Sequence, residues 1–135
     1  MKIRSFSEIV KKRLYGLSKT RLGRDIFSWV LRNMSFALPV KYIKETDSIL
    51  AFHHPSPAYP FHVLMVPKRQ IASLADLSDE DQPFLVEIFS TVQELVQSNA
   101  LDDYGYRLVV NGGKNQEFGI LHFHLISDKE INNTN

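Results

Sequence analysis

Two histidines separated by a single residue lie in an apolar run near the end of the chain, Leu121–Ser127. Successive side chains of a β-strand point to opposite faces, so residues two apart share a face. The spacing therefore predicts a strand that presents His122 and His124 together on one face, while Leu121, Phe123 and Leu125 point the other way. Because those apolar side chains must be covered, the chain is expected to form a sheet with a packed second layer.

A third histidine, His62, lies in a second strand-like run, Phe61–Val66. A polar, glycine-rich segment, Asn111–Gln116, precedes the two-histidine strand and can bend closely around a ligand. A lone His-x-His pair is more often structural than functional, so it is the third imidazole that favours a site. A neutral imidazole is a good nucleophile near pH 7, and the other imidazoles, the loop amides and Lys114 can stabilise developing charge without a metal.

Periodicity and turn residues predict three further strands and one long helix. The strands are Val40–Glu45, Ser48–His53 and Tyr106–Asn111, and the first two form a hairpin. Between the hairpin and Phe61, the segment His54–Pro60 contains three prolines, which exclude it from a central strand. Capping residues at Ser78-Asp79-Glu80-Asp81 precede a helix whose apolar stripe is expected to face the sheet. That stripe comprises Phe84, Leu85, Ile88, Val92, Leu95 and Val96.

Length and composition indicate one globular domain. The chain has 135 residues, 44% of them hydrophobic, which is enough for an ordinary core. It has no cysteine, which excludes disulfides and thiolate metal sites and leaves histidine, carboxylate and carbonyl groups as ligands. No apolar run approaches the roughly 18 residues of a membrane span, and no signal peptide is evident. We therefore expect a cytoplasmic protein.

Positive charge is concentrated at the N-terminus. Residues 1–32 contain nine lysines and arginines against two acidic residues, whereas the whole chain has a net charge of only +1. Apolar residues at helical spacing predict a short basic amphipathic helix over residues 5–15, and a second helix is predicted from Thr20 or Gly23 to Asn33. The basic helix either docks on the domain or contacts an anionic surface, meaning a membrane or a nucleic acid. We divide the chain into a basic helical extension, 1–24, and a domain, 25–135.

Several separated segments together resemble one family. These are Leu50–His53, Pro60–Lys68, Gly105–Asn111 and the final His-x-His-Leu-Ile-Ser run. In this order they resemble the histidine triad (HIT) superfamily, and most closely its Hint-like branch, over about residues 25–127. The resemblance implies an α+β fold, in which a five-stranded antiparallel sheet carries one long packed helix, here with an N-terminal helical extension. It also implies a homodimer.

The resemblance further implies a nucleotide hydrolase or nucleotidyl transferase. Family members act at the α-phosphate of nucleoside phosphoramidates, dinucleoside polyphosphates or nucleotidylated substrates through a nucleotidyl-histidine intermediate, without a cofactor. His122 matches the family's nucleophile, His124 matches a phosphate-contacting histidine, and His62 matches an additional upstream histidine. The predicted nucleotide-binding residues are Asn111, Gly112, Lys114, His54, Phe52, Ile26, Phe27 and Leu64.

Three positions depart from the family pattern. Ile120 replaces the first histidine of the triad, so the triad is incomplete, although its backbone carbonyl can still orient the nucleophile. His54 occupies the position of an acidic residue that holds the ribose hydroxyls. Glu117 stands where a small hydroxyl residue often helps to bind the phosphate, and a carboxylate there repels it. These departures favour an alternative, a weakly active or inactive nucleotide-binding or sensing module.

A second alternative is a metal site. His62, His122 and His124 form a three-imidazole set similar to those that hold catalytic zinc. Such a site requires partners that orient each imidazole through its other ring nitrogen, and the sequence alone does not reveal them.

Overall fold

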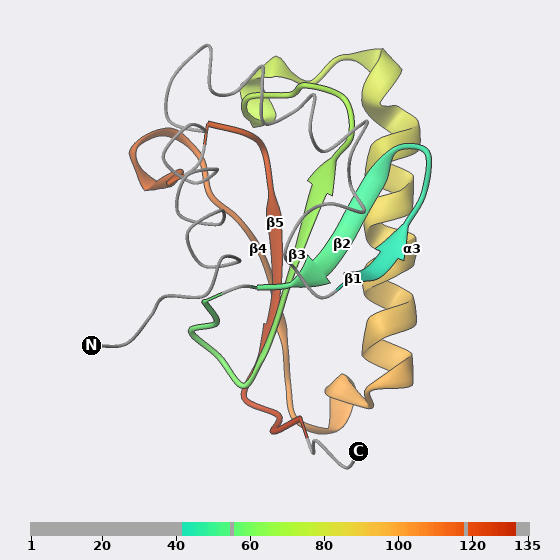
Figure 1. The fold of residues 1–135 in the computed structure, drawn as a ribbon, viewed down its shortest axis with the longest axis vertical. Coiled ribbons are helices and arrows are strands. Elements are labelled where there is room, and N and C mark those ends of the chain that lie inside the picture. Colours follow the sequence, from blue (N-terminus) through green and yellow to red (C-terminus); the bar gives the residue numbers. More distant parts are fainter. Residues whose placement is uncertain (1–41, 55, 118, 132–135) are drawn as a thin grey trace, which may run out of the picture.

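The computed structural model describes residues 42–54, 56–117 and 119–131, which form an α+β domain (Figure 1). Its strands are β1 Tyr42–Glu45, β2 Ile49–His53, β3 Phe61–Pro67, β4 Arg107–Val110 and β5 Phe123–Ser127, and its long helix is α3 Gln82–Ser98. Short 3-10 helices occupy η2 Leu74–Asp76, η3 Asp79–Asp81, η4 Leu101–Asp103 and η5 Gly113–Asn115. The predicted fold class is confirmed.

The five strands form one antiparallel sheet in the order β1-β2-β3-β5-β4 (Figure 1). The predicted hairpin is the β1–β2 pair, while β5 inserts between β3 and β4. The last strand begins two residues later than predicted, because the backbone N–H of Leu121 donates to the carbonyl of Ile71 at 2.9 Å and not to a neighbouring strand. His122 therefore lies on the segment that leads into β5.

One face of the sheet is covered by α3. Phe61, Val63 and Met65 alternate along β3 and pack with Ile88 and the rest of the helix stripe in a single apolar cluster. The helix begins after a capping box in which the side chains of Ser78 and Asp81 satisfy backbone N–H groups, and its proline lies in the first turn as expected. This face supplies most of the core of the described domain.

The opposite face carries a smaller apolar cluster and the histidines. Leu50, Phe52, Leu64, Val66 and Ile120 form this cluster. The strand register sets the side chains of Phe52, Leu64 and His124 in one cross-strand row, because Phe52 pairs with Leu64 and Leu64 pairs with His124. Apolar and imidazole side chains are thus neighbours on this face.

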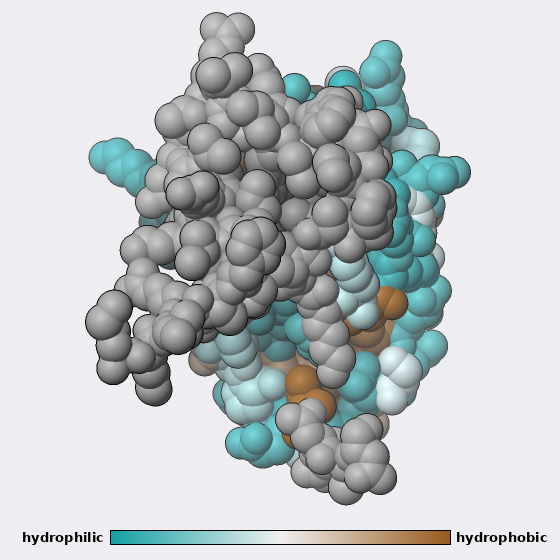
Figure 2. Space-filling view, in the orientation of Figure 1, coloured by the Kyte–Doolittle hydropathy of each residue, from teal (hydrophilic) through white to brown (hydrophobic). Residues whose placement is uncertain are grey.

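Several sequence predictions lie outside the described residues. These include the basic helix over 5–15, the helix ending at Asn33, the boundary between 1–24 and 25–135, and the side chains of Ile26 and Phe27. Within the described ranges, no helix combines the length and the apolar character needed to cross a membrane. The described surface seen in Figure 2 is mainly hydrophilic, with apolar side chains exposed in small spots.

Candidate active site

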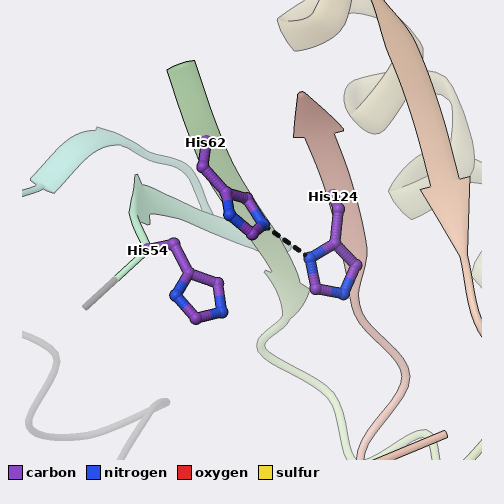
Figure 3. Close-up of side chains that lie close together, drawn as sticks. All are labelled: His54, His62 and His124. Atoms are coloured by element: carbon purple, nitrogen blue, oxygen red, sulfur yellow. Dashed lines mark hydrogen bonds between the residues drawn. The ribbon is translucent and has the colours of Figure 1, made fainter. Parts of the chain in front are cut away.

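Four of the five histidines of the chain gather on the face of the sheet opposite α3. His62 lies on β3, His124 on β5, His122 just before β5 and His54 just after β2. The β3–β5 register sets Leu64 opposite His124, and His62 is one pleat along from Leu64 on the same face. Figure 3 shows the rings of His54, His62 and His124 turned toward one another. We call these four residues the histidine cluster.

Ring contacts hold the histidine cluster together. The Nε2 atom of His62 lies 2.9 Å from the Nδ1 atom of His124, which is a hydrogen-bond distance. The rings of His54 and His62 stack with centroids 4.2 Å apart, and those of His122 and His124 meet edge to face at 4.9 Å. The three separated imidazoles predicted to form the site, His62, His122 and His124, are therefore brought together.

Hydrogen bonds fix which ring nitrogen carries the proton in His62 and His124. The N–H of Ala58 donates to Nδ1 of His62 at 3.2 Å, so the neutral His62 ring carries its proton on Nε2. His62 then donates from Nε2 to Nδ1 of His124, and His124 in turn carries its proton on Nε2. That Nε2–H of His124 is buried, and no hydrogen-bond partner for it lies among the described residues. The chain of bonds thus ends in a donor available to a ligand.

His122 is oriented differently from its neighbours. Its Nδ1 atom lies 2.8 Å from the backbone carbonyl oxygen of Ile120, and because a carbonyl can only accept, Nδ1 carries the proton. The lone pair of the neutral ring therefore resides on Nε2. Ile120 is 2% exposed, so this contact is shielded from water. This contact needs no side chain at position 120, so the Ile120 carbonyl orients His122 although the triad histidine is missing.

The histidine cluster is neutral at pH 7. Burial, followed by the proximity of other histidines, lowers the pKa of His62 and of His124 to about 4. Burial also lowers the pKa of His54 and of His122, although the nearby carboxylate of Glu117 acts in the opposite direction on both. Neutral rings keep the lone pairs that nucleophilic attack requires.

The predicted nucleotide-binding residues divide into two groups. Phe52 and Leu64 are buried in the apolar cluster beside His124. Asn111 is half-buried directly after β4, whereas Gly112 and Lys114 are exposed. The loop that carries these last residues includes η5 and is tied down by the side chain of Gln116, whose Nε2 donates to the carbonyl of Ala72 at 2.6 Å. Which of these residues touch a ligand remains a prediction.

The metal alternative fits the structure poorly. Within the described ranges, the three residues that offer ligand atoms within 4.8 Å of one another are His54, His62 and His124, and not the predicted set with His122. A metal-bound histidine normally donates its other ring N–H to an acceptor. Here Nδ1 of His54 and Nδ1 of His62 instead accept from the backbone N–H groups of Ser56 and Ala58. If Nε2 of either ring bound a metal, Nδ1 of that ring would carry the proton. That N–H would then point at the backbone N–H that now donates to it, and the two donors would repel each other.

Sequence reasoning missed the two amide donors that control this arrangement. In the segment His54–Pro60, three prolines have no N–H, so after His54 only Ser56, Ala58 and Tyr59 can donate from the backbone. Two of those three amides bond to histidine rings. The spacing of the prolines indicates which backbone amides can donate. It does not indicate which ring each amide contacts, because that depends on how the loop folds back over β3.

An antiparallel five-stranded sheet with one packed helix and a cluster of histidines on the face opposite that helix defines a recognisable class of protein. The family model "HIT domain" matches residues 36–131. An uncharacterized HIT-like protein of Buchnera aphidicola is 30% identical over 111 residues, which cover 81% of this chain and 96% of that protein. The chain belongs to the HIT family.

Solved structures agree with this assignment. A HIT family hydrolase from Legionella pneumophila is similar with a TM-score of 0.65 and 31% identity, covering 76% of this chain and 94% of that one. A histidine triad nucleotide-binding protein from Candida albicans is similar with a TM-score of 0.64 and 28% identity, covering 78% of this chain and 75% of that one. The predicted family and fold are both confirmed.

Proposed function

We propose that the protein is a hydrolase or nucleotidyl transferase that attacks the α-phosphate of a nucleoside phosphoramidate or dinucleoside polyphosphate. The observation that carries the proposal is the 2.8 Å contact between Nδ1 of His122 and the carbonyl of Ile120, which leaves the lone pair on Nε2. The resemblance to a HIT family hydrolase and to a histidine triad nucleotide-binding protein supports the class of reaction and ligand.

In the first step, Nε2 of His122 forms a bond to the α-phosphorus while the bond from phosphorus to the leaving group breaks. The leaving group takes a proton from solvent. His122 retains its Nδ1 proton, and the Ile120 carbonyl stabilises the positive charge that the ring acquires. The buried Nε2–H of His124 stabilises the phosphoryl oxygens. In the second step, water adds to phosphorus, the bond to Nε2 breaks, and the surplus proton returns to solvent.

The apolar cluster beside the histidines suits a nucleoside base. Phe52 and Leu64 are 7% and 3% exposed and lie in the same cross-strand row as His124. A base bound beside this row would have its phosphate next to the histidine cluster. Ile26 and Phe27, predicted to complete this wall, lie outside the described residues.

Turnover of adenosine phosphoramidate and of diadenosine polyphosphate tests the proposal. We expect His122→Ala to reduce the rate at least a thousandfold, because the nucleophile itself is removed. The matched control is His53→Ala, since His53 is the one histidine outside the cluster. Turnover that is unchanged by His122→Ala would overturn the proposal, whereas a wild-type protein that binds AMP but turns over neither compound would be a binding module.

That second candidate, a nucleotide-binding module without efficient turnover, is favoured by two side chains. The side chain of Ile120 contributes no polar group to the site and is buried in the apolar cluster with Leu50 and Val66. Glu117 is close enough to His122 to act on its pKa and brings a negative charge toward the proposed phosphate position. The same turnover assay, combined with calorimetric AMP binding, distinguishes the two candidates.

We also propose that the homodimer implied by the resemblance forms through the outer side of α3. Val86 and Phe89 are 67% and 61% exposed there. They line an apolar groove of about 770 Å³ that reaches Tyr106, next to the edge strand β4. A second copy pairing along β4 would cover both the groove and the outer side of this strand, which pairs with no other described strand.

Contact of residues 1–24 with an anionic membrane or nucleic acid remains a prediction. Its test is salt-dependent binding to anionic liposomes and to RNA, compared with a chain that starts at Thr20. Loss of binding in the shortened chain is expected, and equal binding by both chains would contradict the prediction.

A further inference from the structure

If the proposed function holds, the order of side chains across the sheet indicates which part of a nucleotide would lie near His54. Phe52 and Leu64, on β2 and β3, form the apolar side of the site, and His122 and His124 form the phosphate side on β5. His54 follows β2 two residues after Phe52, and its ring stacks on His62. The ring centroids of His54 and His124 are 6.1 Å apart. A ligand with its base on the apolar side and its phosphate on β5 therefore has its sugar beside His54.

His54 faces that position with a hydrogen-bond donor. The backbone N–H of Ser56 donates to Nδ1 of His54 at 3.0 Å, so the neutral ring carries its proton on Nε2. In Figure 3 the ring nitrogen on the side away from the loop points to the side of the site on which His124 lies, while His62 covers the face of the ring. A second bond, from the backbone N–H of His54 to the carbonyl of His62 at 2.9 Å, holds the residue in this place. His54 thus offers an N–H and no acceptor to the sugar.

We propose, on the basis of the function proposed above, that His54 selects nucleotides whose sugar carries a second anionic group, a 2′- or 3′-phosphate, over nucleotides with an unmodified diol. Hydroxyl groups of a diol gain most from an acceptor, because each has a proton to donate. A phosphate oxygen has none and takes the N–H of His54 in a charge-assisted bond, which is stronger than a neutral one.

A negative charge lies near this position, and a positive charge lies on the same loop. The carboxylate of Glu117 is near enough to raise the pKa of His54 and repels an anion. It is exposed, so solvent and salt weaken that repulsion. Lys114, three residues earlier in the same loop, supplies a positive charge that is likewise exposed. Both charges are exposed and weakened by solvent, whereas the hydrogen bond from His54 forms only when the anion lies beside its ring. We therefore attribute the preference for a second phosphate to His54.

Calorimetric binding to the full chain at fixed ionic strength tests the proposal without turnover. The ligands are AMP, adenosine 3′,5′-bisphosphate and adenosine 2′,5′-bisphosphate. We expect one of the bisphosphates to bind about tenfold tighter than AMP, as a charge-assisted hydrogen bond predicts. The two bisphosphates show which sugar position His54 reaches.

Two substitutions make the test specific for His54. His54→Ala should reduce the bisphosphate preference to less than twofold, and His54→Asp should reverse it, because an aspartate accepts from a diol and repels a phosphate. His53→Ala is the matched control and should keep the wild-type ratio, including any part due to the basic N-terminus. A wild-type preference for AMP, or a ratio that His54→Ala leaves unchanged, overturns this proposal alone. Binding of none of the three ligands overturns the proposed function with it.

Discussion

The two faces of the sheet are built from the same strands and differ in what their side chains do. On β3, Val63 and Met65 point toward α3, are fully buried and join a cluster that is apolar throughout. His62, on the same strand, points the other way and takes part in two hydrogen bonds through its ring. One face therefore stabilises the fold through buried apolar area, and the other holds polar rings in defined protonation states.

This difference teaches that stability and chemistry can be changed separately in this protein. The α3 face has no residue of the histidine cluster, and the histidine face contributes the smaller apolar cluster. Truncating an apolar side chain on the α3 face should therefore leave the chemistry of the histidine face intact. Four predictions test that separation.

The largest effect on stability is expected from Ile88→Ala on α3. Ile88 is completely buried in the main apolar cluster. Truncating such a side chain costs about 3 kcal/mol in the free energy of unfolding, or about two orders of magnitude in the folding equilibrium. Urea denaturation measures this loss. Turnover per folded molecule should match wild type, and a parallel loss of turnover would show that the two faces are coupled.

A moderate effect, confined to chemistry, is expected from His62→Ala. Without the Nε2–H of His62, the proton of His124 is no longer held on its Nε2, so the donor to the phosphate is lost in part of the molecules. We expect kcat to fall by about tenfold to a hundredfold. Nitrogen-15 NMR of His124 reports the tautomer directly, with His53→Ala as the control. An unchanged tautomer in His62→Ala would rule out this role.

Stability should depend on pH through the histidine face. The pKa of His62 and of His124 is lowered by burial from 6.5 to about 4. Between these values the unfolded chain binds protons that the folded chain does not, so the free energy of unfolding should rise from pH 4 to 6.5 and level off above it. Urea denaturation across this range measures the slope. His62→Gln should make it shallower, and an identical slope would contradict the assignment.

The smallest effect on the domain itself is expected from Phe89→Glu on the outer side of α3. Phe89 is exposed in the groove proposed as the dimer interface, so the substitution should change the stability of one chain by less than about 0.5 kcal/mol. Light scattering should nevertheless show a dimer for wild type and a monomer for the variant. The control is Glu80→Gln, an exposed position outside the groove. A monomeric wild-type protein would contradict the proposed dimer interface.

Much of the fold could be predicted because its periodicity is strong. The strand-like apolar run Phe61–Val66 and the helical stripe from Phe84 to Val96 gave the correct strand and helix. The start of β5 was placed too early because Leu121 bonds to Ile71, fifty residues away. A hydrogen bond between distant segments cannot be predicted from the periodicity of the local sequence.

The sequence predicted that His62, His122 and His124 would lie together, but not which nitrogen of each ring carries a proton. The two-residue spacing of His122 and His124 and a third histidine on a similar strand pointed to one shared face. The partners of the rings were not predictable, because the Ser56 and Ala58 amides meet them only after a proline-rich loop folds back. The metal alternative shows the same limit, since the three histidines whose ligand atoms lie close together include His54 in place of the predicted His122.

The amino-acid sequence by itself determined the strands, the long helix and which residue types could share a face, because side-chain direction follows from the period of each element. Only the tertiary structure decided which nitrogen of each imidazole carries a proton. That choice depends on which donor or acceptor lies within hydrogen-bond distance, and these groups come from segments far apart in the chain.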